Sequence, residues 1–230
     1  MHRSAPRIAR VLACAAVPVL LVAGCSSGSD SSKKPDGAGS GKTSASAAPA
    51  AAAKFAKLPD PCKSVTQATV ARLVPKVKSA AGTAAKSSVQ DQRGGCSWNG
   101  LDGYQFRWLD VSLQRFDSAN GVGSGEEQAK KRFAEQVATA TQLKGATSAK
   151  ADGVGDEATL VSALVEKDKL NYQDETVVVR TGNVIVILSH NGAGFEGAKT
   201  PAADQLQKDA VAAAKEAVAS VAAANAAANT

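Results

Sequence analysis

The chain has 230 residues, of which 44% are hydrophobic and 21% are charged, and its formal net charge is +6. This length suits one domain with shorter flanking segments. A basic chain can bind nucleic acid, but here the excess lies in residues 1–57, because residues 58–230 contain 19 basic and 19 acidic side chains. A neutral domain lacks the positive surplus that neutralises phosphates, so we expect no nucleic-acid partner.

The first 24 residues predict a secretory signal peptide. Arg3, Arg7 and Arg10 precede residues 11–24, a run of 14 residues without a charge. A basic segment followed by an apolar segment of this length is typical of a signal peptide and is too short to span a bilayer. An uncleaved N-terminal helix is the alternative.

Residues 22–25, Val-Ala-Gly-Cys, resemble the lipobox of bacterial lipoproteins. The resemblance implies that diacylglycerol is attached to Cys25 through a thioether and that the chain is cleaved before this residue. The alternative is an ordinary signal peptide in which Cys25 is incidental. No other stretch reaches 18 apolar residues, so the lipid is the only membrane attachment that the sequence predicts. We therefore expect the protein on the outer face of the cytoplasmic membrane.

Residues 25–57 predict a disordered tether that follows the lipidated cysteine. The segment is a mixture of Ser, Gly, Ala and Pro with almost nothing to bury. Such a composition cannot compensate for the entropy that is lost on ordering. A flexible chain of this length spans on the order of 30 Å, which would lift a domain off the lipid surface.

Cys62 and Cys96 predict a disulfide. Cys14 leaves with the signal peptide and Cys25 carries the lipid, so these two cysteines remain as a pair in an oxidising compartment. A redox-active pair is the alternative. The two residues are far apart in the sequence, however, and the chain has no Cys-x-x-Cys motif.

Residues 58–222 predict a single domain, which begins with a helix and two strands. Thr66 is the expected cap of a helix that ends at Pro75. Two strands then flank a turn at 101–103. The alternation of the second strand shifts near Leu109, which predicts a bulge there.

The rest of the domain predicts two more helices around three strands. Ser124 has capping-box spacing and opens a helix to about Thr141. A final helix begins at 200–201, and residues 223–230 predict a disordered tail. A two-residue hairpin turn at Gly182-Asn183 separates the last two strands. The three strand-like runs are residues 158–165, 175–181 and 184–189.

The predicted element order is therefore α-β-β-α-β-β-β-α. Hairpin-linked strands without a β-α-β-α alternation predict an α+β fold, in which helices pack on an antiparallel sheet of about five strands. The run 184–189 is apolar at both alternating sets of positions. We therefore place it centrally in the sheet, covered on both faces.

Four motifs follow one another along the domain. They are LPDPCKSVTQATVARLV, GGCSW, GVGDEA and VVVRTGNVIVIL, and they fall between residues 58 and 190. Their order, together with the lipobox, resembles an uncharacterised actinobacterial lipoprotein family, a domain of unknown function. Ser64 and Val65 depart from that family, which usually has two leucines there. The resemblance implies a secreted, disulfide-closed domain and carries no known catalytic residue.

Two patterns in the last strand region resemble catalytic sites without the context that such sites need. Residues 192–197 match G-x-G-x-x-G, but a dinucleotide site needs a helix and a further strand after it, so we expect a plain glycine loop and no cofactor. Ser189 and His190 are adjacent on a strand and therefore point to opposite faces. No catalytic residue is assigned.

The sequence also predicts no metal site. His190 is the one histidine left after signal removal, and it cannot form a zinc site with two disulfide-bonded cysteines. Asp152, Asp156 and Glu157 could approach a calcium ion. They lack the alternating ligand spacing of calcium loops, so a turn that runs into a strand is the simpler interpretation.

Five of the nine aromatic residues fall within 19 positions and form the best functional lead. If they share one face of the sheet, a core role is favoured, and a ligand-stacking platform is the alternative. The first four are the candidate ligand contacts. In order, the cluster comprises Trp98, Tyr104, Phe106, Trp108 and Phe116.

The sequence favours a membrane-anchored, non-enzymatic module of the cell envelope that binds a ligand, senses one or interacts with a protein. The alternative is an envelope hydrolase that uses acidic residues or Ser189 with His190. A third hypothesis is a protein-interaction role based on charge, because residues 58–150 carry a net charge of +5 and residues 151–230 carry −5. The sequence predicts neither the ligand nor the oligomeric state.

Overall fold

The computed structural model describes residues 50–226. The predicted signal peptide, the lipidation site at Cys25 and the tether up to residue 49 lie outside the described residues, as do residues 227–230. No helix in the described part of the chain combines the length and the apolar character needed to cross a membrane.

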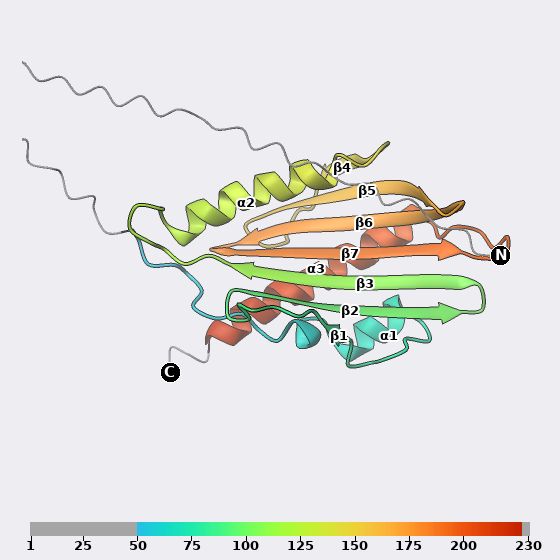
Figure 1. Ribbon diagram of the computed structural model, residues 1–230, viewed down its shortest axis with the longest axis horizontal. Helices are drawn as coiled ribbons and strands as arrows, with labels where there is room; N and C mark the ends of the chain where they lie inside the picture. The colour runs from blue at the N-terminus through green and yellow to red at the C-terminus, as the bar shows by residue number, and fades with distance from the viewer. Residues whose placement is uncertain (1–49, 227–230) are drawn as a thin grey trace, which may run out of the picture. The chain divides into compact units, whose positions relative to one another are not determined.

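One antiparallel sheet of seven strands organises the fold, in the order β1-β2-β3-β7-β6-β5-β4 (Figure 1). β7 lies at the centre between β3 and β6, as its apolar sequence predicts. The strands are β1 (Thr83–Ala84), β2 (Arg93–Asp102), β3 (Gln105–Arg115), β4 (Thr147–Lys150), β5 (Glu157–Lys167), β6 (Leu170–Thr181) and β7 (Val184–Gly194).

The prediction of about five strands is therefore too low. The five long strands match the five predicted strands, and the two additional ones are the short edge strands β1 and β4. All six residues of these two edge strands are exposed. Because nothing in them is buried, they carry no hydrophobic alternation from which a strand could be predicted.

Three α-helices and one 3₁₀ turn pack on the sheet. These elements are η1 (Pro61–Lys63), α1 (Gln67–Leu73), α2 (Gly125–Ala140) and α3 (Ala203–Ala226). Figure 1 shows α2 in front of the sheet and α3 behind it. Thr66 caps α1, and the capping box between Ser124 and Glu127 opens α2, as the sequence predicts.

The two faces of the sheet differ in how they are covered. On the core face, α1 and α3 cover the hydrophobic core, to which Leu109, Val177 and Leu188 belong. Residues one position along each strand point to the opposite face, which we call the open face. The open face carries Phe106 and Trp108 on β3, Asp174 on β6 and Asn191 on β7. α2 lies over one end of the open face, where Arg132 donates a hydrogen bond to Gln114.

The predicted bulge near Leu109 is wrong. β3 pairs with both neighbours without interruption, and Leu109 is opposite Trp98 on one side and His190 on the other. The shift in the hydrophobic pattern has another cause. Leu109, Val111 and Leu113 face the core, whereas the aromatic residues before them lie on the open face.

The folded part of the chain begins before residue 58 and ends after residue 222. Phe55 is buried, and its backbone N–H and C=O both bond to the side chain of Asn183. α3 continues to Ala226, and the Asn225 amide donates to the carbonyl of Lys57. The predicted tether therefore ends earlier than Lys57, and the predicted tail begins too early at residue 223.

The predicted disulfide between Cys62 and Cys96 is confirmed. It joins η1 to β2 across a Cα–Cα distance of 5.1 Å. Cys96 and Trp98 are both 1% exposed, and the Trp98 indole N–H donates to the carbonyl of Ala80. The disulfide therefore anchors the start of the domain to the sheet and lies at the edge of the core.

We expect the double substitution Cys62→Ser with Cys96→Ser to lower the free energy of unfolding by about 2–4 kcal/mol, because the disulfide closes a long loop in the unfolded chain. Chemical denaturation of the oxidised protein and of the double variant measures this difference. Hydrogen exchange should rise first in residues 58–95 and last at the β6–β7 hairpin. Cys25→Ser is the matched control and should leave the free energy of unfolding unchanged. Two reactive thiols in the native protein would contradict the prediction.

Candidate functional site

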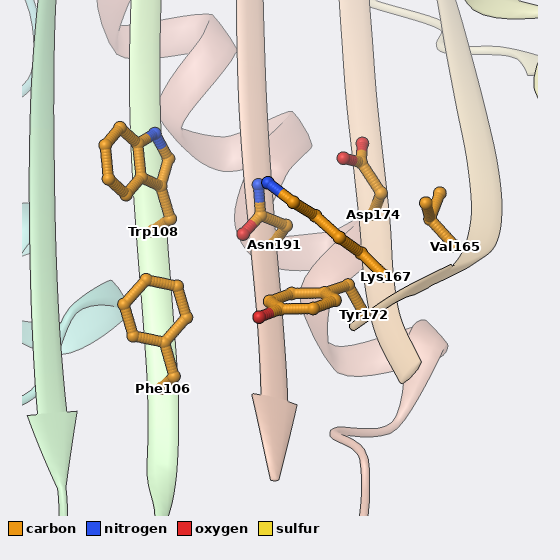
Figure 2. Close-up of a pocket in the computed structure, with 7 residues that line it drawn as sticks. All are labelled: Phe106, Trp108, Val165, Lys167, Tyr172, Asp174 and Asn191. Carbon is orange, nitrogen blue, oxygen red and sulfur yellow. The ribbon is translucent and has the colours of Figure 1, made fainter. Parts of the chain in front are cut away.

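A pocket of about 360 Å³ lies on the open face, at the end of the sheet where β7 finishes (Figure 2). Strand register places its residues in two rows across β3, β7 and β6. One row runs from Phe106 through Ala193 to Tyr172, and the next runs from Trp108 through Asn191 to Asp174. β5 completes the lining. The full set is Phe106, Trp108, Val165, Lys167, Tyr172, Asp174 and Asn191.

The pocket occupies the part of the open face that α2 leaves uncovered. At the other end, Arg132 and Gln136 of α2 lie beside Ile185 and Ile187. Ala129 of α2 is fully buried there. The pocket residues on β3, β6 and β7 are partly exposed. The opposite face of the same strands is packed against the core, which holds the strands in place.

The aromatic rings of the pocket form a bent wall. The ring centroids of Phe106 and Trp108 are 6.4 Å apart, with a 41° angle between the ring planes. Phe195, just after β7, tilts against Phe106 at 5.9 Å. Tilted contacts at these distances are favourable for aromatic pairs. They fix the ring of Phe106 from both sides. Tyr172 lies across β7 from Phe106 in the same row, and its ring extends over β7 beside Asn191 (Figure 2).

Two carboxyl groups lie on this part of the open face. Burial raises the pKa of Asp174, although a hydrogen bond from the Thr176 hydroxyl at 3.2 Å opposes this shift. Burial also raises the pKa of Asp110, which lies on β3 opposite Ser189 in the next row. Among residues 50–226, neither carboxylate forms an ion pair. Asp174 therefore lines the pocket without an ion-pair partner among the described residues, although Lys167 belongs to the same lining.

The four predicted ligand-contact aromatics separate into two groups. Phe106 and Trp108 line the pocket. Trp98 lies in the core beside the disulfide, and Tyr104 is 60% exposed in the β2–β3 turn. Neither of these two lines the pocket, and neither does Phe116. The aromatic cluster therefore does not share one face of the sheet, because β2 and β3 present Trp98 and Trp108 to opposite faces.

Sequence reasoning missed four polar or aromatic members of the pocket: Lys167, Tyr172, Asp174 and Asn191. They come from β5, β6 and β7, far in sequence from the aromatic cluster. Only the register of β3 with β7, of β7 with β6 and of β6 with β5 brings them together. The hairpin turn at Gly182-Asn183 would have given the pairing within β6–β7, since it sets which residues are opposite each other.

Ser189 and His190 point to opposite faces, as neighbouring strand residues do. Ser189 forms a 3.1 Å hydrogen bond with Thr176 on the open face. His190 is 1% exposed in the core, where its Nε2 is 3.2 Å from the carbonyl oxygen of Leu73. The structure does not bring the two side chains together.

Glu175 lies directly opposite His190 on the core face. It is fully buried, and its Oε1 accepts hydrogen bonds of 2.9 Å from both Gln173 and Ser162. Burial raises the pKa of Glu175 and lowers the pKa of His190. Both shifts favour the uncharged form, which is how two ionisable groups persist inside an apolar core.

The three acids weighed as calcium ligands form ion pairs instead. Asp156 and Glu157 both pair with Arg180, and Asp152 pairs with Lys150 at 2.8 Å. Within residues 50–226 no cluster of three or more metal-ligating side chains occurs. The glycine-rich run at 192–197 continues β7 and ends in a turn, so it does not open a helix as a dinucleotide site requires.

Comparison with known families identifies the chain. The family described as "Protein of unknown function (DUF3558)" matches residues 20–168. The chain belongs to this family. The matched region starts earlier than the four motifs and ends before β6, so it includes Phe106 and Trp108 but not Asp174 or Asn191. A search of curated proteins found no match to this sequence.

We expect His190 to make the fold less stable in mild acid. Because its pKa is lowered in the folded state, the unfolded chain binds more protons below about pH 6.5, and the free energy of unfolding falls as the pH drops through that value. His190→Gln keeps an N–H donor for Leu73 but does not titrate. Denaturation at several pH values should show that the free energy of unfolding falls less steeply with decreasing pH in the variant, by up to about 1.4 kcal/mol per pH unit. Equal slopes for both proteins would contradict this role.

Proposed function

We propose that this protein is a membrane-anchored extracytoplasmic lipoprotein whose domain is a non-enzymatic ligand-binding module of the cell envelope. The pocket on the open face is the binding site. The observation that carries the proposal is an aromatic wall beside Asp174, which forms no ion pair within residues 50–226, at an uncovered end of an otherwise well-packed sheet.

The size and construction of the pocket support ligand binding. Its volume of about 360 Å³ falls in the range of small-molecule sites. Every residue that lines it except Lys167 is partly or fully buried. All seven belong to long, paired strands rather than to loops. Side chains held by strands need little reordering when a ligand binds, which favours affinity.

The second part of the proposal is a lipid anchor at Cys25. Cys25 follows a signal-like segment and precedes a Ser/Gly/Ala-rich stretch. A single acyl-bearing group with a flexible spacer would keep the binding domain near the membrane while leaving it free to reorient.

We expect Cys25→Ser to abolish lipid attachment, because the thiol is the nucleophile that would accept the diacylglycerol. Metabolic labelling with radioactive palmitate, followed by gel electrophoresis of the immunoprecipitated chain, measures the attachment. Cys62→Ser with Cys96→Ser is the control and should keep the label. Persistent labelling of the Cys25 variant would remove the anchor from the proposal.

We expect Trp108→Ala to abolish retention of a small molecule by the pocket. The full chain carrying Cys25→Ser is incubated with a small-molecule extract of the cell envelope and examined by native mass spectrometry. An adduct should appear on the parent protein and be lost in Trp108→Ala, since removing the ring forfeits about 0.5–2 kcal/mol of aromatic contact in addition to its buried apolar area. Tyr104→Ala is the matched control, because Tyr104 is an exposed aromatic residue that does not line the pocket. An adduct that survives Trp108→Ala would exclude this pocket as the site.

A further inference from the structure

We propose that the ligand of the open-face pocket is a small organic cation, with an ammonium or guanidinium group that lies over Asn191 between Trp108 and Asp174. This inference rests on the proposed function, because it names the chemical class of ligand for the same pocket. It follows from the charge and the spacing of the pocket residues.

Charge is the first argument. Elsewhere on the open face, Arg180 neutralises Asp156 and Glu157, and other acids of the fold pair with Arg72, Arg115 or Lys63. Asp110 and Asp174 are the two half-buried acids near the pocket, and within residues 50–226 neither has such a partner. Burying an unpaired carboxylate costs free energy, and a bound cation recovers it.

Spacing is the second argument. Trp108, Asn191 and Asp174 are opposite one another on three adjacent strands. Neighbouring strands lie about 4.8 Å apart, so a group above Asn191 is about 5 Å sideways from both the indole and the carboxylate positions. A cation is attracted to an aromatic face within about 6 Å of the ring centroid. One cation over Asn191 can therefore contact the carboxylate and the aromatic wall together.

Hydrogen bonding in the pocket is open to cationic and to neutral ligands, so charge has to distinguish the two classes. The hydroxyls of Thr176 and Ser189 beside the pocket are 3.1 Å apart, and the Thr176 hydroxyl donates to Asp174 at 3.2 Å. Within residues 50–226, the side-chain donors of Trp108, Tyr172 and Asn191 in the lining form no hydrogen bond, so they can serve either class of ligand. A sugar or another uncharged polyol would find aromatic surface here, but it would leave the carboxylate of Asp174 unpaired.

Lys167 shows that a cationic chain fits the pocket. Figure 2 shows its side chain extending from the end of β5 across the pocket toward Asn191. Lys167 is exposed, and among the described residues its ammonium group forms no ion pair with Asp174. Within the lining Lys167 is balanced by Asp174, and Asp110 in the next row adds a second acid close to the pocket. We infer that Lys167 occupies the cation position weakly and is displaced by the ligand.

The test is isothermal titration calorimetry, in which each small-molecule probe is titrated into the full chain carrying Cys25→Ser. The probes are choline, agmatine, and 3,3-dimethylbutan-1-ol, which has the shape of choline without its charge. Choline or agmatine should bind at least about 10-fold more tightly than the uncharged alcohol, a difference of about 1.4 kcal/mol. N-acetylglucosamine is the neutral sugar probe and should bind no better than the alcohol.

Three variants assign the binding to this pocket. Asp174→Asn and Trp108→Ala should each weaken cation binding at least about 10-fold, a loss of about 1.4 kcal/mol. Lys167→Met should tighten it about 2- to 5-fold by removing the competing ammonium group, a gain that partial unfolding cannot imitate. Tyr104→Ala is the matched control and should bind as the parent does.

Several outcomes would overturn the inference. The first is equal affinity for choline and its uncharged analogue, and the second is a higher affinity for the sugar. The third is no binding heat from either cation at concentrations up to about 20 mM, because a site with a millimolar Kd, a binding free energy of about 4 kcal/mol, would be saturated there. Unchanged affinity in Asp174→Asn would do the same. If the envelope extract nevertheless yields an uncharged adduct that depends on Trp108, the proposed binding function stands and only the cationic class is wrong.

Discussion

The pairing of β7 with both β3 and β6 is the interaction on which the rest of the structure depends. It joins the β2–β3 hairpin to the β5–β6–β7 meander and buries Val184, Ile185 and Val186 completely. The same register sets which side chains share a face. A slip of one residue would exchange the two faces of β7, bringing His190 to the open face and Asn191 into the core. Such a slip is costly because it would bury the Asn191 amide in the apolar core, so the pairing that builds the core also fixes the geometry of the pocket.

The two faces of the sheet show how one strand can serve packing and binding together. On β3, Leu109, Val111 and Leu113 are fully buried against the helices, whereas Phe106 and Trp108 stand on the opposite side of the same strand. Packing of the buried face restrains the backbone of the strand, and the restrained backbone keeps the aromatic residues in fixed positions. On the core face the same alternation buries Glu175 and His190, and burial shifts the pKa of each toward the uncharged form.

Sequence patterns predicted the five long strands, the three helices, the central position of β7 and the disulfide, because each leaves a local signal: alternation, a cap, a turn or a pair of cysteines. They did not predict β1 and β4, which are exposed and too short to show a period. The role of Phe55 was also missed, since one apolar residue in a Ser/Gly/Ala segment carries no pattern. Two of the seven lining residues, Phe106 and Trp108, could be named from the sequence. The other five come from β5, β6 and β7, and only the pairing of these strands with β3, which no local signal encodes, brings them to the same place.

The pocket lies at the end of the sheet opposite to the end where the described chain enters the domain. Phe55 is held by Asn183 in the β6–β7 turn, and the described chain begins at that end of the sheet (Figure 1). Asn191 lies eight positions farther along β7, so the pocket is roughly 25 Å from the entry point. The contacts that hold the entering segment and the opening of the pocket therefore use separate ends of the same strands, and one can be altered without rebuilding the other.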